Sequence, residues 1–332
     1  MADPFGIVVF GIILALVFDF GNGFNDAANS ISTVIATRVL TMQQAVVLAA
    51  FANFIAAFVF GVSVASTIGK GIIDPSIVTP VLVISAIIGS IVWVYLTTAF
   101  GLPISASHAL IGGLIGAGFS AGGINALQFS GILVVVLFIF LAPIIGLVGA
   151  VVFSIIILWI ARKSNPNTVN WYFKKLQLLS VSVYSLGHGT NDAQKTMGII
   201  SLLLFSGGFL GKTFFVPFWV IILSHAAIAL GTLAGGRKVV KTMGLRLTSL
   251  KPIQGFCAES AGALTVIAST IFGIPVSTTH VISGSIAGVG VVRRTSAVRW
   301  PIARKIIFAW MLTIPICALI GFVGFKILSS LM

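Results

Sequence analysis

Two matching segments place ion-binding residue types inside stretches that are otherwise apolar. The first reads Gly-Asn-Gly-Phe-Asn-Asp-Ala-Ala-Asn at residues 21–29, and the second reads Gly-His-Gly-Thr-Asn-Asp-Ala-Gln-Lys at residues 187–195. Four of their first six positions are identical. The oxygen-bearing side chains that they share are Asn25, Asp26, Asn191 and Asp192. Such carboxylate and amide oxygens suit a small hard cation such as sodium; a proton on the carboxylate is the other option.

The glycines in these segments favour a break in each helix, at residues 21–24 and 187–190. A break frees backbone carbonyls, which inside a bilayer must line a buried or wet cavity, so Gly21 and Gly187 join the candidate sodium ligands. Two matched breaks, one in each half, indicate the midplane site of a secondary transporter. The alternative is that each carboxylate only caps a broken helix, although an uncompensated carboxylate at membrane depth is costly.

A second pair of segments predicts an anion site. Residues 101–108 read Gly-Leu-Pro-Ile-Ser-Ala-Ser-His, and residues 273–280 read Gly-Ile-Pro-Val-Ser-Thr-Thr-His. Each is typical of a turn followed by a helix start, where unpaired amides bind anions. Two such tips that meet would present amides and hydroxyls to a tetrahedral oxyanion. The candidate phosphate ligands are Ser105, Ala106, Ser107, Ser277, Thr278 and Thr279, together with Asn25 and Asn191. Alternatively, the hydroxyls cap only their own helices.

The two halves differ at charged positions. Glu259 has no acidic counterpart, because Ile87 occupies the matching place, and Lys195 matches Asn29. Glu259 therefore joins the candidate sodium ligands, and one half is expected to be the ion-binding half. A simple Lys195–Glu259 ion pair is the competing interpretation.

Other polar residues of these motifs are expected to support the site: His108, His280, Gln194, Gln254 and Lys195. The two histidines would hydrogen-bond the site or relay protons, or be packed and satisfied. Asp19, which matches Ser185 in the second half, has no role in this arrangement.

The elements that must position these residues are membrane helices. Of the 332 residues, 58% are hydrophobic and 8% are charged, and the mean hydropathy is +1.17. This composition is typical of an all-α, multi-spanning membrane protein. The net charge of +13 does not indicate a nucleic-acid partner, because the basic residues cluster in loops between apolar runs. Orientation in the membrane and contact with anionic lipid headgroups explain them better.

The repeat divides the chain into two inverted-topology halves. Residues 1–160 are the first repeat, with a broken helix at 5–37 and a helical hairpin at 80–119. Residues 161–175 are a basic cytoplasmic connector. Residues 176–332 are the second repeat, with a broken helix at 176–206 and a paired hairpin at 252–292. If each half crosses the membrane an odd number of times, the second half begins on the opposite side of the membrane from the first, so the two repeats are inverted. This holds whether the hairpins are re-entrant or cross the membrane fully.

The loop charges predict that both termini lie outside. That orientation places 15 of the 19 Lys and Arg residues on the inner side, as the positive-inside rule requires. The outer side receives Lys70, Lys212 and Lys326, and Lys195 lies in the second motif.

The paired Gly-Asn-Asp motifs resemble the duplicated signature of the PiT family of inorganic phosphate transporters, and the Gly-Pro-Ser-His segments and residues 254–259 are similar to that family as well. The resemblance covers essentially the whole chain. It implies inverted repeats with paired hairpins, a central phosphate site, sodium beside Asp26 and Asp192, and often a homodimer. Members use sodium or protons. This chain departs from the two-glutamate pattern of some members at Ile87, and it lacks the long intracellular loop of the animal proteins.

We therefore expect a secondary active importer of inorganic phosphate in the cell (inner) membrane, surrounded by lipids. It would be coupled to sodium, with protons possible, and would need no cofactor besides the coupling ions. The alternatives are a sulfate or metal-phosphate transporter of the same architecture and a passive anion channel. An intramembrane enzyme acting on phosphate esters is disfavoured, because the sequence lacks a plausible nucleophile–base pair.

Overall fold

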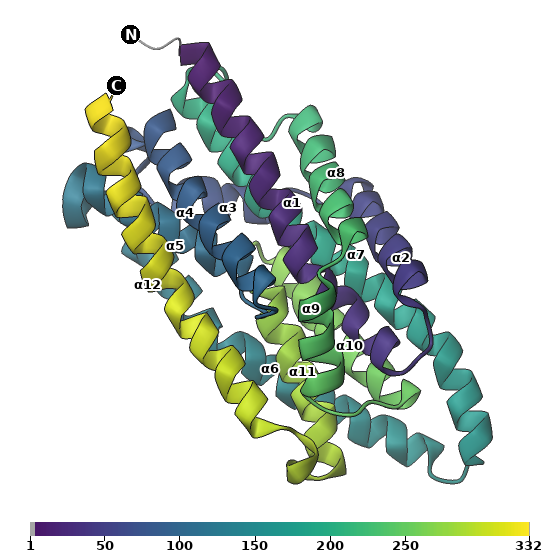
Figure 1. Ribbon diagram of the computed structural model, residues 1–332. Coiled ribbons are helices and arrows are strands. Elements are labelled where there is room, and N and C mark those ends of the chain that lie inside the picture. Colours follow the sequence, from purple (N-terminus) through teal and green to yellow (C-terminus); the bar gives the residue numbers. More distant parts are fainter. Residues whose placement is uncertain (1–3, 332) are drawn as a thin grey trace.

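The computed structural model describes residues 4–331, and the regular elements in that range are helices (Figure 1). The first half contains α1 (Pro4–Ala36), α2 (Met42–Ile55), α3 (Ser63–Gly71), α4 (Pro80–Ala99), α5 (Ala106–Gly122) and α6 (Phe129–Ala161). The second half contains α7 (Pro166–Ser206), α8 (Phe218–Ala234), α9 (Arg237–Val240), α10 (Pro252–Ile271), α11 (Thr278–Arg293) and α12 (Trp300–Leu331). A π-helical turn, Lys241–Arg246, continues α9.

The helices are long and apolar enough to cross a bilayer. Five described helices meet this criterion individually, and up to seven spans result if two bent helix pairs are counted. The α6 helix exposes a band of large apolar side chains that includes Leu137, Phe140 and Ile144, as expected for a surface that faces lipid. The prediction of an all-α, multi-spanning membrane protein is confirmed.

The predicted breaks in α1 and α7 are wrong, because both helices continue through the glycines. The glycines instead permit close helix packing. A Cβ on Gly23 would overlap the carbonyl of Ile228 in α8, and a Cβ on Gly189 would lie 2.6 Å from the Cα of Asn53 in α2. Small residues of this kind let helix backbones approach closely in membranes. The bends lie elsewhere, at 84° between α2 and α3 and at 66° between α8 and α9.

The connector between the halves is shorter than predicted. The α6 helix ends at Ala161 and α7 begins at Pro166, so only residues 162–165 separate them. Asn165 caps α7 by accepting a hydrogen bond from the backbone N–H of Asn167 (2.9 Å), and Pro166 occupies the first helical position. This start signal makes residues 166–175 helical, although their composition is that of a polar loop.

Each half contributes one helical hairpin: α4–α5 comes from the first half and α10–α11 from the second. Their turns contain Gly101 and Gly273, each with φ +69°, a conformation that favours glycine. The second helix of each hairpin packs against the last helix of the other half: α5 packs against α12, and α11 packs against α6. The two halves are therefore interlocked.

Figure 1 shows that α1 begins and α12 ends at the same end of the molecule. The α6–α7 and α11–α12 connections lie at the opposite end. Those two connections carry a dense group of basic residues that includes Arg162, Lys163, Arg293 and Arg294.

Candidate functional site

The hairpin tips begin with two serine caps. The hydroxyl of Ser105 accepts a hydrogen bond from the backbone N–H of His108 (3.2 Å), and that of Ser277 accepts one from the N–H of His280 (3.3 Å). Both hydroxyls are therefore used within their own helices, as the alternative interpretation expected. The residues that follow each cap place their amides in the first turn of α5 and α11, where helix amides have no helical acceptor.

The two tips meet each other and the second signature motif. Thr279 donates a hydrogen bond to the carbonyl of Ile104 across the junction (3.0 Å). The Nζ of Lys195 hydrogen-bonds the Ser107 hydroxyl of one tip and the Val276 carbonyl of the other (2.8 Å to Val276). Lys195 is 1% exposed, so a buried positive charge bridges the tips.

The two signature carboxylates face these tips but have different partners. Asp192 forms an ion pair with Lys195, lies 3.1 Å from the Nε2 of His188, and accepts a hydrogen bond from Thr278 (2.9 Å). Asp26 accepts one long hydrogen bond from Thr279 (3.3 Å). Asp26 and Asp192 are 3% and 1% exposed. Among the described side chains, Asp192 has a basic partner within ion-pair distance and Asp26 has none.

The signature asparagines make equivalent contacts in the two halves. The Nδ2 of Asn25 donates to Thr98 in α4 (2.6 Å), and that of Asn191 donates to Thr270 in α10 (2.9 Å). Asn29 instead crosses to the opposite tip and donates to Thr279 (2.9 Å) and more weakly to Thr278. Within residues 4–331, the Oδ1 atoms of these asparagines are buried and have no hydrogen-bond partner: Asn25, Asn29 and Asn191.

These groups form an arrangement that fits a cation. Asp26, His188 and Asp192 each offer a ligand atom, and the three atoms lie within 4.8 Å of one another. Carboxylate and amide oxygens are the ligands that hard cations prefer. The amide oxygens of Asn25, Asn29 and Asn191, which are unpartnered within residues 4–331, are ligand atoms of this type.

Glu259 lies in a separate polar cluster. Its carboxylate accepts hydrogen bonds from Thr33 (2.5 Å), Gln177 (2.9 Å) and Ser180, and it is fully buried. The suggested Lys195–Glu259 ion pair is wrong, because Lys195 pairs with Asp192. The structure therefore does not bring Glu259 into contact with the groups around Lys195.

Several predicted supporting residues have structural contacts of their own. Gly21 and Gly187 lie inside continuous helices, so the prediction that their carbonyls are freed is wrong. Gln194 accepts a hydrogen bond from the backbone N–H of Val64 at the start of α3 (2.8 Å). Gln254 accepts one from the N–H of Lys251 and caps α10 (2.9 Å).

The two predicted histidines meet where the hairpins cross. The His108 and His280 rings lie 4.6 Å apart in an edge-to-face contact, and His280 stacks on Trp310 at 3.7 Å. Both histidines are buried. The Nδ1 of His280 also lies 3.2 Å from the carbonyl of Ile139 in α6. The two histidines therefore pack the junction of the tips.

Two contributors to the site carry weak sequence signals. His188 is one residue of the second Asn-Asp motif, and its spacing of four residues from Asp192 places both on one helix face. Asn53 carries no local signal, yet its Oδ1 lies 3.2 Å from the Nδ1 of His188 and its Nδ2 donates to Thr232 (2.9 Å). Only the packing of α2 against α7 and α8 reveals it.

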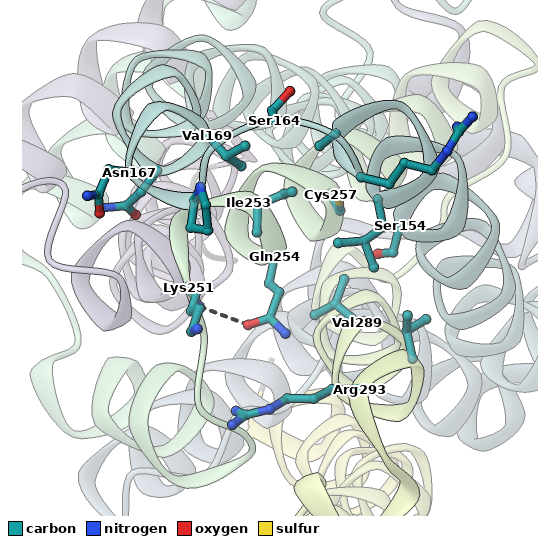
Figure 2. A pocket seen from close by; sticks show the side chains of 16 residues that line it. Ser154, Ser164, Asn167, Val169, Lys251, Ile253, Gln254, Cys257, Val289 and Arg293 are labelled. Carbon is teal, nitrogen blue, oxygen red and sulfur yellow. Dashed lines mark hydrogen bonds between the residues drawn. The ribbon is translucent and has the colours of Figure 1, made fainter.

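A separate cavity of about 790 Å³ lies between α6, α7, α10 and α11 (Figure 2). Its lining includes Arg162, Lys251 and Arg293 and does not include either signature carboxylate. Figure 2 shows the Lys251–Gln254 hydrogen bond at its wall. Gln254 therefore lines this basic cavity, whereas the two signature carboxylates contact Thr278 and Thr279 at a hairpin tip.

Comparison with known proteins agrees with this geometry. A family model described as the phosphate transporter family matches residues 22–321. A protein of Rhizobium meliloti (strain 1021) named a probable low-affinity inorganic phosphate transporter is 54% identical, over 96% of this chain and 95% of that protein. A Bacillus subtilis (strain 168) protein of the same name is 39% identical, over 96% of each chain.

A solved structure described as the sodium-dependent phosphate transporter is similar throughout. It has a TM-score of 0.89 and 26% sequence identity, and the match covers 98% of this chain and all of that one.

Proposed function

This chain belongs to the phosphate transporter family, and from that membership we propose that it imports inorganic phosphate by secondary active transport coupled to sodium. The family consists of transporters, so this chain is a membrane transporter and not an enzyme. The sodium dependence of the similar solved structure supports the choice of coupling ion.

The observation that carries the proposal is that a basic side chain compensates the charge of only one of the two carboxylates. Lys195 neutralises Asp192, whereas Asp26 is buried without a described basic partner. Phosphate near neutral pH carries one to two negative charges, and an uncompensated carboxylate beside it would repel it strongly at low dielectric. A cation on Asp26 removes that repulsion, so cation binding precedes or accompanies phosphate binding.

We assign the cation to the oxygens around the two carboxylates. Asp26 would contribute a carboxylate, and Asn25, Asn29 and Asn191 would contribute amide oxygens that have no hydrogen-bond partner within residues 4–331. A second cation would be held at Asp192 if Lys195 turns toward the bound anion. The protein would thus exchange the Lys195–Asp192 ion pair for a Lys195–phosphate contact.

We assign phosphate to the two hairpin tips. The first-turn amides of Ala106, Ser107, Thr278 and Thr279 would bind its oxygens, aided by the positive ends of α5 and α11. The hydroxyls of Ser107, Thr278 and Thr279 would add hydrogen bonds. Ser105 and Ser277 would keep the helix starts in place as caps.

The threonine hydroxyls couple the two ligands in this scheme. Thr278 and Thr279 donate to Asp192 and Asp26. A cation that occupies the carboxylate oxygens would displace these hydroxyls, which then turn to donate to phosphate. Linkage requires that each ligand raise the affinity of the other by the same factor.

We further propose that both termini face outward in the cell membrane. The end of the molecule opposite the termini carries the α6–α7 and α11–α12 connections with their basic residues (Figure 1), and cytoplasmic loops are enriched in Lys and Arg. A homodimer and bound lipids stay predictions from the family resemblance.

One observation favours protons as the alternative coupling ion. The Nε2 of His188 lies 3.1 Å from a carboxylate oxygen of Asp192 at the centre of the site, which is the hydrogen-bonding distance that proton transfer between two groups requires. The coupling experiment therefore has to impose sodium and proton gradients separately.

The test is phosphate uptake into proteoliposomes that contain the purified protein. An inward sodium gradient should drive accumulation of labelled phosphate above the external concentration, and an inward proton gradient without sodium should not. Accumulation with protons alone would reassign the coupling ion. If labelled phosphate only equilibrates across the membrane under either gradient, the protein is a passive channel. If sulfate competes with the uptake of labelled phosphate, the substrate assignment changes to include sulfate.

Asp26→Asn tests the role of the uncompensated carboxylate. Phosphate binding should become less dependent on sodium, because the amide keeps an oxygen but removes the charge. Binding isotherms over a sodium series, with choline holding the ionic strength constant, measure this. Asp74→Asn is the matched control in the α3–α4 connection. The N–H of Ser76 lowers the pKa of Asp74, so this control also removes a full negative charge at neutral pH.

A further inference from the structure

The cavity between α6, α7, α10 and α11 has no part in the proposed transport site (Figure 2). Its volume of about 790 Å³ lies within the range of sites that bind small molecules, about 300–1,000 Å³. It lies at the end of the molecule that carries the α6–α7 and α11–α12 connections (Figure 1). The signature carboxylates do not line it, so its chemistry is separate from theirs.

The mouth of the cavity is formed by three exposed basic residues. Arg162 follows α6, Lys251 precedes α10, and Arg293 ends α11. Among the described residues that line the cavity there is no Asp or Glu. Within residues 4–331, none of the three basic groups lies at ion-pair distance from a carboxylate. Positive charge from three elements therefore gathers at one cavity without a protein anion to balance it, which favours an anionic ligand.

The basic side chains keep hydrogen-bond donors for such a ligand. One Nη1 atom, that of Arg162, donates to the carbonyl of Trp159 (2.8 Å), and that of Arg293 donates to the hydroxyl of Ser249 (3.2 Å). A guanidinium carries five N–H donors in a planar fork, so one such contact leaves others for a ligand. Two guanidinium groups and an ammonium group suit the oxygens of a phosphate group.

The wall of the cavity beyond its mouth is apolar. It is formed by Leu158 of α6, Ile253 of α10, and Val289 and Val292 of α11. A small soluble anion would be held at the basic mouth and would leave this wall in water. A ligand with both an anionic group and hydrocarbon would cover the mouth and the wall, and burial of the hydrocarbon would add to its affinity.

The aromatic residues around the cavity place it at the membrane interface. Leu158 and Trp159 are 46% and 64% exposed on α6, as expected beside lipid, and the guanidinium of Arg162 lies 3.9 Å from the centre of the Trp159 ring. On α7, the Nζ of Lys175 lies 3.8 Å from the centre of the Trp171 ring. Tryptophan beside Lys or Arg is typical of the level where lipid headgroups lie. The basic mouth is therefore at headgroup level, next to a surface that faces acyl chains.

We propose that this cavity is a binding site for one anionic phospholipid. The phosphate of the lipid lies among Arg162, Lys251 and Arg293, and an acyl chain lies along the apolar wall. Basic pockets between membrane helices hold anionic headgroups in this way. The site goes beyond phosphate transport and does not depend on which ion drives it.

The charges of this site are not repeated in the first half. The alignment that matches Pro252 with Pro80 and His280 with His108 places Thr79 at the position of Lys251. It also places Ala121 at the position of Arg293. The lipid therefore binds at the basic end of the molecule only. There it contacts α6 of the first half and α10–α11 of the second, so it should stabilise the folded protein by binding to it.

The experiment measures lipid binding to the purified full-length protein in neutral detergent by native mass spectrometry. Wild type should bind one phosphatidylglycerol molecule per chain more tightly than phosphatidylcholine with the same acyl chains. Arg162→Gln and Arg293→Gln should each weaken phosphatidylglycerol binding by about fivefold. Lys163→Gln and Arg294→Gln are the matched controls, because they remove the same charge from exposed neighbouring positions that do not line the cavity. Both controls should bind the lipid like wild type.

Two soluble probes separate a lipid from a free anion. Phosphatidylglycerol should raise the thermal unfolding midpoint of wild type, whereas its deacylated headgroup, glycerophosphoglycerol, and inorganic phosphate should not raise it through this cavity, a contribution measured as the difference between Arg293→Gln and Arg294→Gln. If a soluble probe matches the lipid in this difference, the cavity binds a soluble anion and the lipid assignment is overturned. Equal binding of phosphatidylglycerol and phosphatidylcholine would overturn the role of the basic mouth. Equal weakening in the cavity variants and their controls would reduce the effect to general surface charge and overturn the site.

Discussion

Lys195 determines the charge balance of the site. It is the basic residue that bridges both hairpin tips and pairs with Asp192, and it is almost fully buried. In the first repeat Asn29 occupies the equivalent place and reaches the opposite tip through Thr279. The repeat therefore keeps the crossing contact in both halves and charges only one of them, which leaves Asp26 without a basic partner among the described side chains.

We predict that Lys195→Gln destabilises the protein by about 3–5 kcal/mol, because it leaves Asp192 buried without its partner. The double variant Lys195→Gln with Asp192→Asn should recover much of that loss, because no buried charge remains unpaired. Thermal unfolding in detergent measures both, read as a double-mutant cycle. Lys212→Gln, at an exposed loop position, is the control. Additive effects of the two single changes would contradict the coupling.

The two kinds of hydroxyl at the tips should respond differently to truncation. We expect Thr278→Val to weaken phosphate binding by about 1–3 kcal/mol, through the loss of a charge-assisted hydrogen bond. Ser105→Ala removes a helix cap and should cost about 0.5–2 kcal/mol of stability. Phosphate titration at saturating sodium and thermal unfolding separate the two effects. A phosphate affinity that is unchanged in Thr278→Val would remove this threonine from the anion site.

At the scale of the elements, glycine stripes set how closely the hairpins pack. A Cβ on Gly116 of α5 would overlap the carbonyl of Ala318 in α12, and a Cβ on Gly288 of α11 would overlap that of Leu147 in α6. In each case the obstacle is backbone, which cannot rotate away. Both stripes are of the small-xxx-small type, with Gly112 and Gly284 one turn earlier.

We predict that Gly288→Leu destabilises the protein by about 1–3 kcal/mol or more, the usual range for overpacking. The α11 helix would have to move away from α6, which displaces the Ser277 cap and the tip that it supports. Thermal unfolding and phosphate binding should both decline. Gly61→Leu is the matched control, because a Cβ there would meet no atom within 4 Å. Equal effects at the two positions would contradict the packing argument.

At the scale of the whole molecule, the halves form one interlocked unit. The α6 helix belongs to the first half but packs against α11, and α12 of the second half packs against α5. Each hairpin is therefore supported by a helix from the other repeat, and the two tips meet through Thr279 and Lys195. A half expressed alone would lack one wall of its own hairpin.

The orientation prediction is tested by labelling single cysteines in intact cells. Ser330→Cys, near the end of α12, should react with a membrane-impermeant maleimide added outside. Ser164→Cys, in the α6–α7 connection, should react only after the cells are opened. Both positions are exposed, and the native Cys257 and Cys317 are buried. Outside labelling of Ser164→Cys would reverse the orientation and the assignment of the basic end to the cytoplasm.

The sequence by itself determined the features that depend on composition and on near neighbours in the chain. Apolar runs of sufficient length predicted the membrane helices. The turn followed by a helix start in each Gly-Pro-Ser segment offered capping as one of two interpretations of the hydroxyls, and Ser105 and Ser277 are caps, because capping joins atoms a few residues apart. The repeated Asn-Asp pairs identified the carboxylates that the structure brings to one place.

Only the tertiary structure decided what those residues contact. The glycines at 21–24 and 187–190 are compatible either with a broken helix or with close packing, and the backbones of α2 and α8 beside them determine the outcome. The partner of Lys195 was equally open, since Asp192 and Glu259 were both available. The Glu259 carboxylate is satisfied by Thr33 and α7, so Lys195 is left with Asp192. Partners of buried charges are set by which helices touch, and that information is not local in the sequence.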